Sequence, residues 1–61
     1  MAQITEKELS ALGDLLTAEA TMKAKCEYMA SITEDKALAN TYTQMAQRHA
    51  HHFDELFSNL K

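Results

Sequence analysis

Residues 9–29 read LSALGDLLTAEATMKAKCEYM, and this stretch decides the fold because its apolar side chains recur at helical spacing. The apolar stripe is broad, as is typical of a helix that touches two neighbouring helices. Its members are Leu9, Leu12, Leu15, Leu16, Met22, Cys26 and Met29. Glu19 lies inside this stripe, where a leucine is expected, and is therefore the first candidate for a functional residue.

The first helix has a clear start signal. Residues 5–8 read TEKE and form a capping box, in which Thr5 accepts a hydrogen bond from the backbone N–H of Glu8 and the Glu8 side chain reaches back to Thr5. This signal predicts a helix over about residues 6–31. Within it, Gly13 costs about 1 kcal/mol relative to alanine, and it either allows another backbone to come close or is simply tolerated.

Residues 31–35 read SITED and mark the break before a second helix, which we expect over about residues 34–59. The hydroxyl of Ser31 or Thr33 can cap this helix, and the acidic residues that follow suit the positive end of its dipole. One face of the helix is apolar but carries two histidines. That face consists of Leu38, Tyr42, Met45, His49, His52, Phe53, Leu56 and Leu60.

Two long helices joined by a short turn must run antiparallel, so residues 1–61 are expected to form a single helical hairpin. With the turn near residues 32–34, facing positions sum to about 67, and Glu19 meets the region of Arg48 and His49. One hairpin leaves a wide apolar face open to water. Pairing two hairpins around a two-fold axis closes that face into a four-helix bundle, so the sequence predicts an all-α fold and a homodimer.

Length and composition narrow the class of protein. A chain of 61 residues buries little apolar surface by itself, and its single cysteine, Cys26, excludes an internal disulfide. The net charge of -3 and the absence of a basic stripe argue against nucleic-acid binding. No apolar run approaches a membrane span and no secretory signal is visible, so we expect a soluble cytoplasmic protein.

The candidate metal ligands are Glu19, His49 and His52. The two histidines are three residues apart and share a helix face. Two imidazoles with a carboxylate opposite them can bind a divalent metal, zinc or iron. Two other readings stay open: Glu19 and His49 form an internal polar pair, or surface histidines capture metal adventitiously. Cys26 has no histidine at its level and is expected to be a core residue rather than a nucleophile.

Two segments carry a resemblance to a known family: residues 14–19, DLLTAE, and residues 48–56, RHAHHFDEL. With these segments the chain resembles the ferritin-like superfamily, in particular the small spore coat protein F-like group. The resemblance spans nearly the whole chain as half of a bundle. It implies a ferritin-like four-helix bundle built from two hairpins and a structural role in a spore coat.

The resemblance also has a gap. In metal-binding ferritin-like proteins each half supplies a glutamate from one helix and a Glu-x-x-His motif from the next. Glu19 matches the first element, and His49 or His52 matches the final histidine. The position three residues before His49 is Ala46, and the position three before His52 is His49 itself. A bridging carboxylate is therefore missing, which argues against a di-iron carboxylate site and oxidase chemistry.

The sequence states no reaction and favours a non-enzymatic role. The leading hypothesis is a self-associating helical hairpin with a structural or interaction role, in the cytoplasm or a spore coat. The first alternative is a metal-binding ferritin-like protein that uses Glu19, His49 and His52. The second is an adaptor hairpin whose open face binds a different protein.

Overall fold

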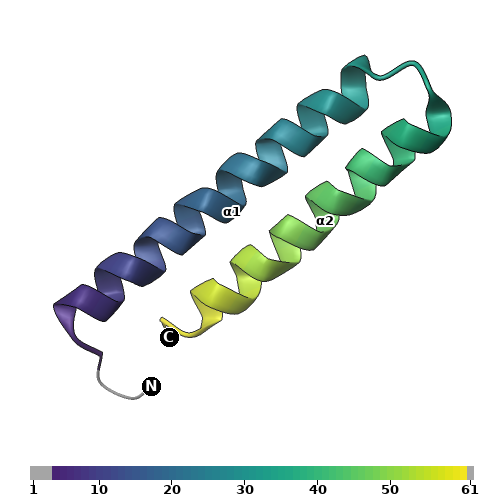
Figure 1. Ribbon diagram of the computed structural model, residues 1–61. Helices are drawn as coiled ribbons and strands as arrows, with labels where there is room; N and C mark the ends of the chain where they lie inside the picture. The colour runs from purple at the N-terminus through teal and green to yellow at the C-terminus, as the bar shows by residue number, and fades with distance from the viewer. Residues whose placement is uncertain (1–3, 61) are drawn as a thin grey trace.

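The computed structural model describes residues 4–60 as two long helices that run antiparallel and pack side by side (Figure 1). Helix α1 spans Glu6–Ile32 and helix α2 spans Lys36–Ser58. No strand is present in this range. The prediction of an all-α helical hairpin is confirmed. Neither helix has an apolar stretch of the length and hydropathy that crossing a membrane requires.

The N-terminus of α1 carries the capping box that the sequence predicts. The Thr5 hydroxyl oxygen accepts from the Glu8 backbone N–H at 3.0 Å, and the Thr5 backbone N–H donates to Glu8 Oε1 at 3.1 Å. The hydrogen bond from the backbone N–H, and after it the side-chain hydrogen bond with Thr5, lower the pKa of the Glu8 carboxyl. The start of α1 is thus fixed by its own local sequence.

The turn between the helices differs from the expectation in one respect. The prediction that Ser31 or Thr33 caps the second helix is wrong, because Asp35 is the N-cap and its carboxylate accepts from the Leu38 backbone N–H at 2.9 Å. The hydroxyls of Ser31 and Thr33 instead donate back to carbonyl oxygens of α1. A carboxylate satisfies the N-terminal N–H groups and also favours the helix dipole, so Asp35 is the stronger cap.

The hairpin has little interior. Cys26 and Ala46 are the buried apolar residues within residues 4–60, and both are small. The burial of Cys26 confirms its expected place in the core. The chain extends over 47 × 15 × 10 Å with a radius of gyration of 14.4 Å, whereas a compact domain of this length has about 10.5 Å. The molecule is therefore a rod that leaves much of its apolar surface exposed.

The capping box gives a prediction about acid stability. Because the pKa of Glu8 is lowered from its ordinary value of 4.5 in the folded chain, the ionised carboxylate stabilises the fold fully above that pH. This contribution disappears as the pH falls through the lowered folded-state pKa. We expect Glu8→Ala to lower the Tm at neutral pH, and the difference from wild type to shrink below pH 4.5.

Thermal unfolding, followed by circular dichroism at neutral pH and below pH 4.5, measures the Tm difference between Glu8→Ala and wild type. Glu6→Ala is the matched control, because Glu6 lies in the same first turn but outside the capping box. Its difference from wild type should change less with pH. Equal pH dependence of the two variants would contradict the assignment of the effect to the capping box.

Candidate metal centre

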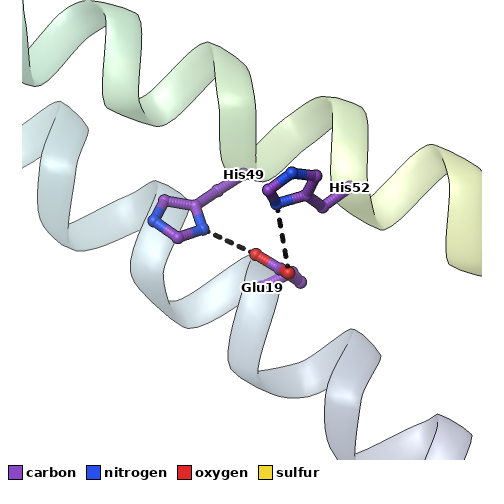
Figure 2. A group of neighbouring side chains, drawn as sticks. All are labelled: Glu19, His49 and His52. Atoms are coloured by element: carbon purple, nitrogen blue, oxygen red, sulfur yellow. Dashed lines mark hydrogen bonds and ion pairs between the residues drawn. The ribbon is translucent and has the colours of Figure 1, made fainter.

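Glu19 of α1 lies between two histidines of α2, as Figure 2 shows. Its Oε1 is 2.6 Å from His49 Nδ1, and its Oε2 is 3.4 Å from His52 Nδ1. Each carboxylate oxygen therefore faces its own imidazole. The predicted register, which places Glu19 opposite His49, is confirmed by this contact.

Helix geometry explains why the three side chains meet. Residues three apart lie on one face of a helix, so His49 and His52 project toward α1 together. Their rings are edge-on to each other, with centroids 6.2 Å apart and planes at 84°. This orientation turns Nδ1 of both rings toward the same carboxylate (Figure 2). The cluster is built from one turn of α2 and a single position on α1.

The cluster is partly shielded from water. The side chain of Glu19 is 21% exposed, that of His49 is 24% and that of His52 is 44%. A carboxylate at this depth is costly unless hydrogen bonds replace the lost water, and the short contact with His49 does so. This pairing explains how Glu19 is tolerated inside an apolar stripe. Its other oxygen has the longer and more exposed contact.

The three residues offer one nitrogen or oxygen ligand each, and these atoms all lie within 4.8 Å of one another. Ligands of a tetrahedral zinc ion lie roughly 3.3–3.5 Å apart. Closing this set onto an ion therefore requires a contraction of at most roughly 1.5 Å, which side-chain rotation can supply. The same atoms can hold either a shared hydrogen bond or a divalent cation.

A shallow hollow of about 280 Å³ opens beside the cluster. It is lined by Leu15, Glu19, His52, Glu55, Leu56 and Asn59. Glu55 is a residue that the sequence analysis did not single out for this region. Its carboxylate contacts His51 Nε2 at 2.5 Å, in an exposed pair on the outer side of α2. The spacing of four residues between His51 and Glu55 is the sequence signal for this pair.

Comparisons with known proteins identify no family for this chain. The chain matches no protein-family model, no curated protein and no solved structure. The site is therefore interpreted from its own atoms.

The pair of Glu19 with His49 and the pair of His51 with Glu55 give a testable contrast. Glu19 and His49 are largely shielded, whereas His51 and Glu55 are largely exposed. We expect a double-mutant cycle with alanine at Glu19 and His49 to give a coupling energy of about 1–2 kcal/mol. The same cycle at His51 and Glu55 should give less than about 0.5 kcal/mol, because water screens an exposed pair.

Urea unfolding at neutral pH and fixed protein concentration measures both cycles. The exposed pair is a matched control, since it has the same chemistry and a similarly short contact. Coupling energies of equal size would contradict the view that burial strengthens the Glu19–His49 interaction.

Proposed function

We propose that this chain is a non-enzymatic helical hairpin that self-associates into a homodimeric four-helix bundle with a structural or interaction role. The single observation that carries the proposal is a row of large apolar side chains that the hairpin leaves exposed along both helices. We define the apolar face as the side that carries Leu15, Met22, Met29, Leu38 and Met45.

Helical spacing places these five residues on one side of the hairpin. Leu15, Met22 and Met29 are seven residues apart, so they follow one line along α1. Leu38 and Met45 form the corresponding line on α2, and His52 continues it after seven more residues. Because Leu15 and His52 line the same hollow, the two lines border each other.

The exposure of this face is high for side chains of this size. Leu15 is 53% exposed, Leu38 is 46%, Met22 is 39% and Met45 is 37%. Scattered apolar side chains on a surface are ordinary, but a contiguous patch marks an interaction site. These four residues and the half-buried Met29 recur at seven-residue spacing along both helices, as expected for such a patch.

The surface area of the chain supports a second copy as the occupant. The chain exposes 4823 Å². A compact dimer of twice the 6.9 kDa chain mass exposes about 6600 Å² in total. Two hairpins would therefore lose roughly 3000 Å² on reaching ordinary compactness, which is more than the roughly 1200–2000 Å² of a standard stable interface.

Symmetry also favours a second copy. A two-fold axis brings the same patch of each subunit together, so one apolar face covers the other without a further partner. Two helices from each copy then give the four-helix arrangement, whose core is the apolar stripe that the sequence displays. The resemblance of residues 14–19 and 48–56 to the spore coat protein F-like group supports a coat-like structural setting for this assembly.

The second candidate function is metal binding through Glu19, His49 and His52, with zinc or iron as the ion. The observation that favours it is the convergence of three ligand atoms within 4.8 Å. The set has no second carboxylate, so we propose a cation site rather than di-iron oxidase chemistry. The adaptor role requires the apolar face to stay free in the purified protein.

Charge on the apolar face tests the proposal. We expect Met45→Lys to raise the dissociation constant of the dimer at least about 100-fold, because a two-fold interface would bury two unpaired ammonium groups. Gln47→Lys is the matched control: Gln47 is exposed and borders a groove on the opposite side of the hairpin, with Lys23 and Ala50. It should change the constant less than about threefold.

Sedimentation equilibrium measures both constants, and circular dichroism reports whether each variant stays helical. A second pair on α1 keeps the test decisive if Met45→Lys unfolds: Met22→Lys on the apolar face against Ala24→Lys on the opposite side. Equal weakening by both members of each pair would contradict the assignment of the interface to the apolar face.

A further inference from the structure

The Glu19 cluster and the apolar face are not separate features of the hairpin. Glu19 lies between Leu15 and Met22 along α1, and His52 follows Met45 by seven residues along α2. The hollow beside the cluster has Leu15 and Leu56 in its lining together with Glu19 and His52. The candidate ligands therefore border the surface that a second copy would cover.

Covering this surface changes the environment of the cluster. His49 satisfies one oxygen of Glu19 at 2.6 Å, but the other oxygen has only a 3.4 Å contact with a His52 ring that is 44% exposed. Water reaches this open side of the cluster in a single hairpin. A second copy seated on the apolar face displaces that water, and a carboxylate oxygen without a replacement partner then opposes association.

A divalent cation resolves this conflict. Bound between the carboxylate and the two imidazoles, it takes the place of the lost water and offsets the negative charge of Glu19. Two imidazoles with one carboxylate are a ligand set that zinc accepts, and three protein ligands leave one coordination position open.

We infer that a divalent transition-metal cation, with Zn(II) as the probe, binds Glu19, His49 and His52, and that this binding and self-association strengthen each other. The ligand set is complete in one hairpin. The coupling rests on the proposed homodimer, because it acts through the water that the second copy displaces. Because the dimer holds two such sites, reciprocity requires that the metal change the dimer constant by the square of the factor by which dimerisation raises the metal affinity of each site.

The experiment compares the dimer dissociation constant with and without Zn(II), by sedimentation equilibrium of the untagged chain. We expect Zn(II) to lower this constant at least about tenfold. His52→Gln removes one ligand, so its dimer dissociation constant should be the same with and without Zn(II). His51→Gln is the matched control, since it makes the same substitution at the neighbouring exposed histidine and should respond like wild type.

Isothermal titration calorimetry of Zn(II) into each protein measures the affinity for the metal. Because Met45→Lys is expected to weaken the dimer strongly, it gives the affinity of the single hairpin. We expect that variant to bind Zn(II) more weakly than wild type, by about the square root of the factor seen in the dimer constant, because the dimer holds two sites. If the dissociation constant of the wild-type dimer does not change when Zn(II) is added, the proposed coupling is wrong. Self-association is still supported in that case. Equal loss of Zn(II) binding in His51→Gln and His52→Gln would contradict the proposed site. It would mean that the histidines capture the metal adventitiously.

The failure of self-association gives a different result. A wild-type chain that stays monomeric with and without Zn(II) contradicts both the homodimer and the coupling, and the measured mass alone distinguishes this case from the others.

Discussion

Two helices can cover only the seam between them, and this limit governs the rest of the molecule. In the hairpin of α1 and α2 the seam takes in the small residues Cys26 and Ala46, while larger side chains on either side stay partly in water. Residues 4–60 form no third element that could cover these side chains. Its radius of gyration of 14.4 Å reflects the same shortage of interior. The proposed second copy of the chain would cover these exposed apolar side chains.

Glu19 shows how a polar group fits into such a thin core. Near the seam it keeps about a fifth of its side chain exposed and receives a short contact from His49 on the other helix. A leucine would contribute more apolar burial, but it would give the helices no polar contact to define their register. A paired polar group near a helix interface favours one alignment over its neighbours, and we interpret the Glu19–His49 contact in this way.

Much of the fold follows from local signals in the sequence. The capping box at Thr5 and Glu8 fixes the start of α1, and the short turn fixes the register that brings Glu19 to His49. The candidate ligands were predicted on the same basis, because helix spacing puts His49 and His52 on one face. These features depend on neighbours along the chain or on a simple count across the turn.

Features decided by competition between similar groups were harder to predict. Ser31, Thr33 and Asp35 can all cap a helix, and the choice depended on how far α1 continues, which reaches Ile32. His51 pairs with Glu55, although Glu55 also lines the hollow beside the Glu19 cluster. Several side-chain pairings are compatible with the same sequence. Which of them forms depends on the relative positions of the side chains in the folded chain.

Whether the hairpin self-associates is decided by the molecular mass of the untagged wild-type chain, measured by sedimentation equilibrium at micromolar concentration. The sample is kept free of metal with a chelator, and circular dichroism is recorded alongside. We expect a helical species of twice the 6.9 kDa chain mass. A stably folded helical monomer under these conditions would contradict it.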